Sequence, residues 1–230
     1  MPRGAATEPV ARSIIGAAFV SLDGVMQAPG GIDEDRSGGF AHGAWLAPVG
    51  DEALEQALGA LFDGEFDLLL GRRTYDIFAA YWPYASMDNP IAAKFAEYDK
   101  FVLTGRDAPL DWAGSHRLAS IDEIAALKAG DGRDLIVQGS STLYPQLLER
   151  GLIDRLVLMI APVLLGSGKR LFGDDTPPRT LRLVSQVTGS NGMNVATYEP
   201  AGPVEHAPAG PEITSDAELA RRAEVAKGTW

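Results

Sequence analysis

FDLLLGRRTYDIFAAYW, residues 66–82, changes character abruptly in its middle. The apolar start is typical of a buried strand, and after Gly71, Arg72, Arg73 and Thr74 the apolar residues resume at helical spacing. A glycine, two cations and a hydroxyl between a strand and a helix can hold a negatively charged group. The stretch therefore predicts a strand–helix unit whose junction binds an anion.

The same pattern recurs at two other predicted strand ends. An apolar run also ends at a glycine, next to an arginine or to hydroxyl side chains, in FVLTGRD (101–107) and in LIVQGSST (135–142). In an open α/β sheet, ligands bind outside the carboxyl ends of the strands, so we expect the three junctions to form one phosphate-binding site. Its candidate residues are Gly71, Arg72, Thr74, Thr104, Arg106, Gly139, Ser140, Ser141 and Thr142.

Strands and helices alternate along most of the chain. We expect strands at 13–24, 66–71, 100–105, 134–139 and 154–166, helices at 51–62, from about 74, 89–98, 120–130 and 141–151, and a hairpin at 180–200 turning at Asn191 and Gly192. This order predicts an α/β fold with a mainly parallel central sheet, helices on its faces and an antiparallel C-terminal edge.

Composition narrows the class of partner. The chain has 230 residues, 46% of them hydrophobic, and a net charge of -11, which argues against nucleic-acid and anionic-membrane partners because both need a basic face. A local arginine cluster can still bind a small anion. The chain has no cysteine, which excludes disulfides and thiolate metal sites. No apolar run has the character of a signal peptide or a membrane span, so we expect a cytoplasmic protein.

Taken together, these stretches resemble a known family. SLDGVM (21–26), LLLGRRTYDIFAAYWP (68–83), KFVLTGR (100–106), LIVQGSSTLYPQLLERGLIDRLVL (135–158) and APVLLGSGKRLFG (161–173) are similar to the dihydrofolate reductase superfamily, in the branch that includes the reductase domain of the bifunctional riboflavin-biosynthesis deaminase–reductase. The resemblance implies a dihydrofolate-reductase-like three-layer sandwich. It also implies an NADPH-dependent reductase that transfers a hydride to a pteridine-like or pyrimidine-like heterocycle, or to a carbonyl or imine.

The resemblance also assigns roles to the candidate residues. Gly71, Arg72 and Thr74 would face the pyrophosphate and the 2′-phosphate of NADPH. Thr104 and Arg106 would flank the adenosine phosphate, and residues 139–142 would cradle the pyrophosphate from the other side. Asp23 and the loop after it would lie near the nicotinamide and the substrate.

Three residues of the predicted substrate side have two open interpretations each. Asp23 is the best-placed carboxylate to donate the proton, but beside Gly24 it can instead shape the turn after the first strand. Trp45 and Trp82 can line a pocket for the substrate ring, or they can belong to the core or its rim.

Several polar groups fit no site motif. Folate reductases use an acid on their first helix, but Asp51, Glu52 and Glu55 sit in no recognisable motif, so we do not expect folate reduction. The carboxylates of residues 33–35 lack calcium-loop spacing and predict a solvated loop. His42, His116 and His206 are scattered, so we expect no metal site.

The expected organisation is a flexible N-terminus (1–12), a reductase domain (13–199), and a linker with a short helix (200–230) that begins at Ser215. The apolar stretch LIDRLVLMIAPVLLG (152–166) and the resemblance together predict a homodimer. The alternative function is a nucleotide-binding or pterin-binding protein of the same fold that lacks turnover.

Overall fold

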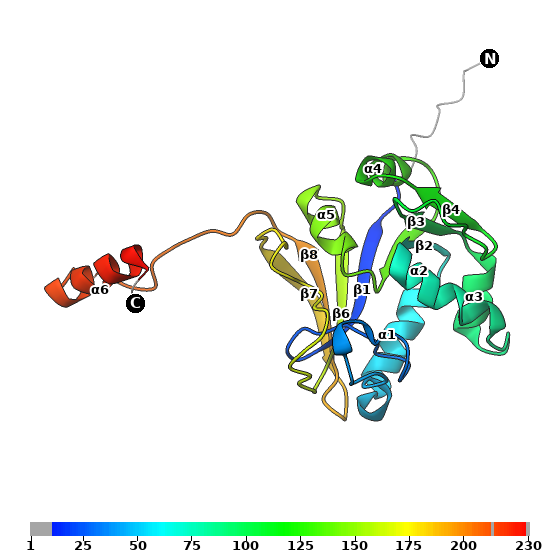
Figure 1. Ribbon diagram of the computed structural model, residues 1–230, viewed down its shortest axis with the longest axis horizontal. Helices are drawn as coiled ribbons and strands as arrows, with labels where there is room; N and C mark the ends of the chain where they lie inside the picture. Colours follow the sequence, from blue (N-terminus) through cyan, green and yellow to red (C-terminus); the bar gives the residue numbers. More distant parts are fainter. Residues whose placement is uncertain (1–10, 213, 229–230) are drawn as a thin grey trace, which may run out of the picture.

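The computed structural model describes residues 11–212 and 214–228, so most of the predicted N-terminal segment and Trp230 lie outside the described residues. The strands are β1 (Ile14–Ser21), β2 (Phe66–Gly71), β3 (Lys100–Leu103), β4 (Ser115–Leu118), β5 (Asp134–Gln138), β6 (Arg155–Ala161), β7 (Leu181–Thr188) and β8 (Asn194–Pro200). The α-helices are α1 (Glu52–Phe62), α2 (Arg72–Ala79), α3 (Pro90–Glu97), α4 (Ile121–Ala129), α5 (Leu143–Glu149) and α6 (Asp216–Lys227), and short 3-10 turns include η3 (Trp82–Tyr84) (Figure 1).

The eight strands form one sheet in the order β4-β3-β2-β5-β1-β6-β8-β7. Pairing is parallel from β4 through β6, whereas β8 pairs antiparallel with β6 and with β7. The central strand β1 pairs only with β5 and β6, at Ile14↔Leu135 and Ile15↔Arg155, among the residues that the structure describes. The predicted parallel sheet with an antiparallel C-terminal edge is confirmed.

Helices cover both faces of the sheet, because successive side chains along each strand point to opposite faces. One core cluster joins the sheet to α1, α2 and α3 through residues such as Leu54, Tyr75 and Phe95. The other joins it to α4 and α5 through Ile124 and Leu147. These layers confirm the predicted three-layer sandwich (Figure 1).

Two sequence expectations about the strands need correction. No strand is expected from the sequence at β4, which is a four-residue edge strand with His116 and Arg117 exposed. The stretch predicted as one strand over 154–166 is regular only as far as Ala161. Because β6 lies inside the sheet between β1 and β8, its apolar character reflects burial within the chain. The exposed edge belongs to β7, where Leu183, Val184 and Val187 are about half exposed.

The β7–β8 hairpin is held by the start of α1. Asp51 caps α1 by accepting a hydrogen bond from Ala53 N (3.1 Å), and its other oxygen accepts from Asn191 N (2.9 Å) and Met193 N (3.3 Å) in the hairpin turn. Glu52 accepts from both the backbone N–H and the hydroxyl of Ser190. These two first-helix acids therefore bind the hairpin turn.

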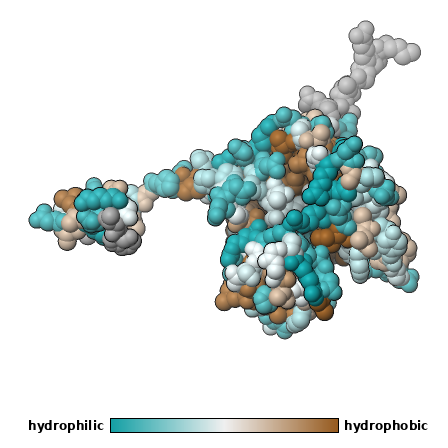
Figure 2. Space-filling model, viewed as in Figure 1, coloured by the Kyte–Doolittle hydropathy of each residue, from teal (hydrophilic) through white to brown (hydrophobic). Residues whose placement is uncertain are grey.

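The C-terminal helix α6 stands apart from the body (Figure 1). Ser215 accepts a hydrogen bond from Glu218 N (3.2 Å), as the capping pattern predicted. No residue of the helix is buried, and Figure 2 shows it clear of the body at the end of the segment that follows β8. The helix thus makes no packing contribution to the core of this chain.

Candidate functional site

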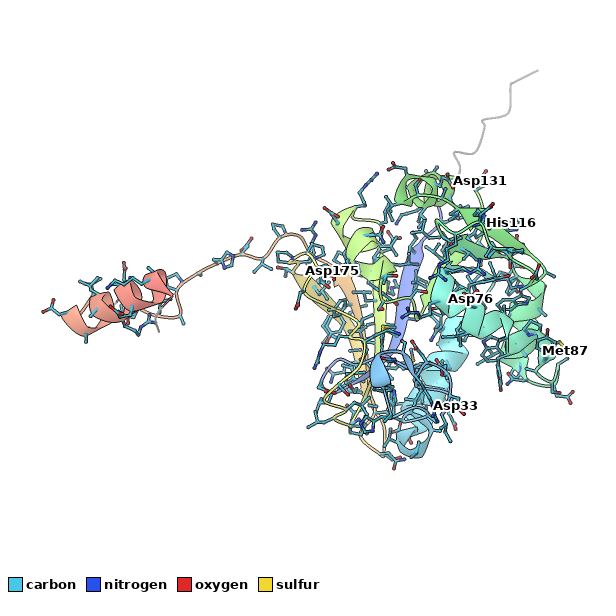
Figure 3. All side chains as sticks on the ribbon, viewed as in Figure 1. Asp33, Asp76, Met87, His116, Asp131 and Asp175 are labelled. Atoms are coloured by element: carbon cyan, nitrogen blue, oxygen red, sulfur yellow. The ribbon has the colours of Figure 1, made fainter. Side chains whose placement is uncertain are left out.

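Two strand ends are joined by side-chain hydrogen bonds. Gly71 N donates to Ser140 Oγ (2.9 Å), and Ser140 N donates to Thr74 Oγ1 (3.0 Å). We call Gly71, Thr74, Gly139 and Ser140 the strand-end clasp. The structure thus brings together four of the predicted anion-binding residues, from β2–α2 and β5–α5, at the carboxyl edge of the sheet. In Figure 3 this edge faces the end of the body where Asp33 is labelled, opposite Asp131, which precedes β5.

The clasp depends on an unusual backbone turn. Gly139 and Ser140 both have left-handed backbones, with φ of 63° and 61°. A Cβ on Gly139 would lie 3.1 Å from Thr74 Cγ2, so a larger residue would press on the clasp as well as strain the backbone. Glycine at this position keeps the backbone of the turn open to close approach.

The helix after β2 offers backbone donors at the clasp. Its N-cap is Gly71, and no described side chain caps the helix. The first N–H groups of an α-helix have no intrahelical acceptor, and they lie at the positive end of the helix dipole. Ser141 and Thr142 follow Ser140 of the clasp in the turn after β5, and Thr142 caps α5 without a side-chain hydrogen bond to a described residue. The clasp is therefore bordered by donors suited to an anion.

The two predicted phosphate-binding arginines differ in how they are engaged. Arg72 Nε donates to Asp76 Oδ1 (2.8 Å), and its Nη1 donates to Ala108 O (3.0 Å) in the loop after β3. Asp76 lies on α2, above the loop that carries Asp33 in the view of Figure 3. Arg106 N donates to the buried Thr104 Oγ1 (3.1 Å), and the exposed guanidinium of Arg106 makes no ion pair within the described residues.

Arg72, which follows Gly71 of the clasp, also lines a groove of about 530 Å³. The groove lies between α2, η3 and the loop that follows β3. Its apolar lining includes Tyr75, Trp112 and Met87. Tyr75 Oη accepts a hydrogen bond from Trp112 N (3.0 Å), which fixes the loop against α2. The guanidinium of Arg72 is thus directed along the outside of α2 toward this groove.

Asp23 links the turn after β1 to the loop after β6 through hydrogen bonds. Its carboxylate accepts hydrogen bonds from Ser21 Oγ (2.6 Å), Leu165 N (3.1 Å) and Gly166 N (2.7 Å). The bonds from Ser21 and Leu165 lower the pKa of Asp23 to about 2. The geometry therefore fits the turn-shaping interpretation better than proton donation, because the group is ionised and its oxygens are occupied. Proton donation by Asp23 stays an untested prediction.

The glycine-rich loop after β1 is built around a buried glutamine. Gln27 Nε2 donates to Asp35 O (3.0 Å) and Ser37 O (2.9 Å), and its Oε1 accepts from Lys169 N (2.9 Å). Trp45 is buried and donates from Nε1 to Gln27 O (2.8 Å). This contact secures the loop, and it places the indole of Trp45 in the core cluster beside α1.

Trp82 packs against the edge of the same core cluster. It is half-buried in η3, where its ring packs edge-on against Phe78 and Phe95. No ring contact joins it to Trp45 among the described residues. The two tryptophans predicted to bind substrate therefore make no ring contact with each other among the described residues, although both pack in the same core cluster, and their role in binding stays a prediction.

The loop carboxylates are more engaged than a solvated loop would be. Asp35 pairs with Lys169 and lies 4.0 Å from Arg73 Nη1, and its side chain is only 12% exposed. Glu34 accepts from the N–H groups of Gly30 and Gly31 (both 2.9 Å), and burial raises its pKa. These contacts tie the loop after β1 to the loop after β6 and to α2.

One polar residue at this edge was not singled out from the sequence. Gln138 ends β5 and is buried, and its Oε1 has no hydrogen-bond partner among the described residues. The signal was visible, since glutamine is a polar end to the otherwise apolar run LIVQ (135–138). Within residues 11–212 and 214–228, no group of three metal-ligating side chains occurs, and no helix is long and apolar enough to span a membrane.

The parallel sheet, the three layers and the clasp at its carboxyl edge define a reductase-type fold of the dihydrofolate reductase kind. The family model for the RibD C-terminal domain matches residues 12–195. The chain therefore belongs to the RibD C-terminal domain family.

The individual relatives have low sequence identity to this chain. The uncharacterized protein YyaP of Bacillus subtilis (strain 168) is 28% identical over 137 residues, which are 57% of this chain and 72% of that protein. A putative riboflavin biosynthesis protein from Shewanella sp. PV-4 is similar in structure, with a TM-score of 0.60 and 22% identity over 82% of this chain and 99% of the other. Dihydrofolate reductase from Enterococcus faecalis, solved with NADP(H), gives a TM-score of 0.52 and 16% identity over 82% and 96% of the two chains. These structural similarities show the fold.

Proposed function

We propose that the protein is an NADPH-dependent reductase of a small heterocyclic, carbonyl or imine substrate. The observation that carries this proposal is the strand-end clasp, in which Ser140 Oγ and Thr74 Oγ1 hold two strand–helix junctions together at 2.9 and 3.0 Å. A dinucleotide needs donors on both sides of its pyrophosphate, and the clasp joins two donor-bearing turns. The Enterococcus faecalis reductase of the same fold was solved with NADP(H), which supports the cofactor class.

The residues present fit such a cofactor. The open backbone at Gly139 and the uncapped start of α2 would hold the pyrophosphate, with Ser141 and Thr142 as further donors. When bound, NADPH would supply the hydride, so the reducing group belongs to the cofactor and not to the chain. The chain's own tasks are to bind and orient the reactants, to exclude water and to admit one proton.

The preference for NADPH over NADH would rest on arginine. The guanidinium of Arg106, which makes no ion pair within the described residues, and the remaining donors of Arg72 would be available to a 2′-phosphate. Thr104 accepts a hydrogen bond from Arg106 N and so holds the backbone at Arg106. Fluorescence titration of the protein with NADPH and with NADH tests this preference. We expect tighter binding of NADPH by about tenfold or more, the effect of one or two charge-assisted hydrogen bonds. Equal affinities would contradict it.

On the substrate side, we propose that Asp23 is a positioning residue. Its ionised carboxylate holds Leu165 and Gly166 against the end of β1, so it would shape the surface that contacts the substrate. A bound water would then deliver the proton. Trp45 and Trp82 are proposed to act indirectly, by fixing the loop and the η3 wall around the substrate.

A binding protein without turnover is the second candidate, since the clasp would serve binding alone equally well. NADPH oxidation followed at its absorbance band, with a panel of pterin, pyrimidine and quinone substrates, separates the two. Oxidation that depends on one substrate class supports the reductase. NADPH binding without oxidation by any member of the panel supports the binding protein.

We also propose that the protein is a homodimer that pairs through β7. Among the described residues this strand is the edge of the antiparallel side of the sheet, and three of its apolar residues are about half exposed. Edge strands of this kind are templates for pairing with another chain. Light scattering at micromolar concentration tests the proposal, and a monomer mass would refute it.

A further inference from the structure

The groove on the outer face of α2 is a site distinct from the strand-end clasp. It measures about 530 Å³, and none of the clasp residues is among the described residues that line it. Its lining positions on α2 are 72, 75, 76, 79 and 80, a spacing that forms one face of a helix. Thr74 of the clasp lies on a different face. The volume of the groove is in the range of small-molecule pockets.

The lining of the groove suits a flat ring. Much of it consists of small or rigid residues, which are Ala79, Ala80, Ala96, Ala113, Pro83 and Pro109. Two larger side chains of the lining extend into solvent, since Tyr84 is 82% exposed and Met87 is 53% exposed. Exposed apolar side chains beside a hollow are typical of a ligand-binding surface. Small walls leave room for a planar group, and Tyr84 and Met87 are free to pack against it.

The charges of the groove favour a cation. Asp76 Oδ1 accepts a hydrogen bond from Arg72 Nε (2.8 Å), and Ala108 O accepts from Arg72 Nη1, so these two groups already engage the guanidinium. Asp111 also lines the groove, and its exposed carboxylate makes no hydrogen bond or ion pair within the described residues. The lining therefore keeps one uncompensated negative charge, which attracts a cation and repels an anion.

The indole of Trp112 limits where that cation can lie. The ammonium of Lys100 is 4.4 Å from the centre of the indole ring and donates a hydrogen bond to Ala113 O (3.1 Å). Lys100 is fully buried, so this cation is a fixed part of the groove wall behind Trp112. A second cation stacked on the same indole would be repelled by Lys100. A ligand cation is therefore directed to Asp111, and its ring to the exposed rim.

We propose that this groove binds a small organic cation that carries a flat aromatic ring. Asp111 would hold the ammonium or amidinium group, and Tyr84 and Met87 would cover the ring. Arg72 would keep its contacts with Asp76 and Ala108. The ligand class follows from the groove alone, so the inference does not rest on the proposed reductase activity.

Three indole compounds of similar size test the charge preference. Tryptamine carries a cation, tryptophol is neutral and indole-3-acetate carries an anion. Isothermal titration calorimetry of the full chain, at neutral pH and low salt, should show the tightest binding for tryptamine. Indole-3-acetate should bind about tenfold more weakly or worse, because an exposed carboxylate attracts the one and repels the other by up to about fivefold each. Added salt should narrow this difference, since exposed charges are screened.

Substitutions locate the bound probe. Asp111→Asn keeps the size of the side chain and should weaken tryptamine binding by up to about fivefold while leaving tryptophol unchanged. Asp107→Asn removes an exposed carboxylate of the same loop that does not line the groove, so it is the matched control and should change neither affinity. Tyr84→Ala should weaken all three probes and Tyr84→Phe should restore them, because the rim needs the ring and not the hydroxyl. Melting curves confirm that each variant folds.

Each contrary result overturns the proposal in a different way. Equal tryptamine binding by the wild type, Asp111→Asn and Tyr84→Ala would place the probe outside the groove. A preference for indole-3-acetate would exclude a cation site, and no binding of any probe at millimolar concentration would exclude the ligand class. Tryptamine should also bind with unchanged affinity at saturating NADPH, and full displacement would make the groove part of the cofactor site. A chain that ignores NADPH but binds tryptamine through Asp111 would refute the proposed function and leave this inference standing.

Discussion

Replacing Asp51 tests whether the first-helix acid serves stability or substrate binding. The residue is 8% exposed, and its carboxylate accepts three backbone hydrogen bonds, one in α1 and two in the β7–β8 turn. Asp51→Ala removes a helix cap, which costs about 1 kcal/mol. It also leaves Asn191 N and Met193 N without their charged acceptor, at about 1.5 kcal/mol each. The expected loss of unfolding free energy is therefore about 4 kcal/mol.

Urea denaturation and thermal melting measure this loss. For a chain of this size each kcal/mol lowers the melting temperature by roughly 2–4 °C, so the variant should melt roughly 8–16 °C lower. Asp51→Asn keeps one acceptor oxygen and should lose about half as much. Glu55→Ala, an exposed position one turn along α1, is the control and should stay within about 0.5 kcal/mol of the wild type. The reasoning is refuted if Asp51→Ala is as stable as the wild type yet loses activity, as a substrate-binding acid would.

Three further predictions concern other groups. Asp23→Asn should lower kcat by less than about tenfold, because asparagine tolerates the same turn but keeps only one of the two oxygens that accept from Leu165 and Gly166, whereas a fall of about 100-fold with unchanged NADPH affinity would restore Asp23 as the proton donor. Burial lowers the pKa of Lys100 to about 8 from 10.5, so between these values the unfolded chain binds more protons and the free energy of unfolding rises with pH. Denaturation across that window should show this rise, at most about 1.4 kcal/mol per pH unit, in the wild type and not in Lys100→Met, and parallel curves would contradict it. Deleting residues 203–230 should leave NADPH affinity unchanged in a titration, since α6 touches no part of the clasp; weakened binding would show that the tail completes the site.

Much of the fold could be predicted because its signals are local. Glycine at the end of an apolar run marks β2 and β5, and the polar residues after them mark the starts of the next helices. β4 could not be predicted, since a four-residue edge strand with two exposed polar side chains shows no hydrophobic alternation. The edge position of β7 depends on strand order, which no single stretch of sequence encodes.

The sequence indicates which residues lie at the candidate site, but it does not indicate which way their side chains point. The residues of the clasp follow from the strand ends, yet the direction of Arg72 depends on Asp76 one turn later and on Ala108 in a separate loop. Asp23 lies close to its expected place, but the backbone groups that occupy its oxygens come from residues 165 and 166, over 140 positions away. The unpaired amide of Gln138 likewise depends on what fails to approach it in the packed structure.

The pairing of β1 has a consequence for synthesis of the chain. Its two neighbours, β5 and β6, begin at residues 134 and 155, so the central strand β1, which ends at residue 21, leaves the ribosome well before either of its partners. Pairing between such remote segments is slow, because a long loop must close before any contact rewards it. During that interval the apolar strand IIGAAFVS (14–21) is uncovered on both edges, which exposes it to aggregation in the nascent chain.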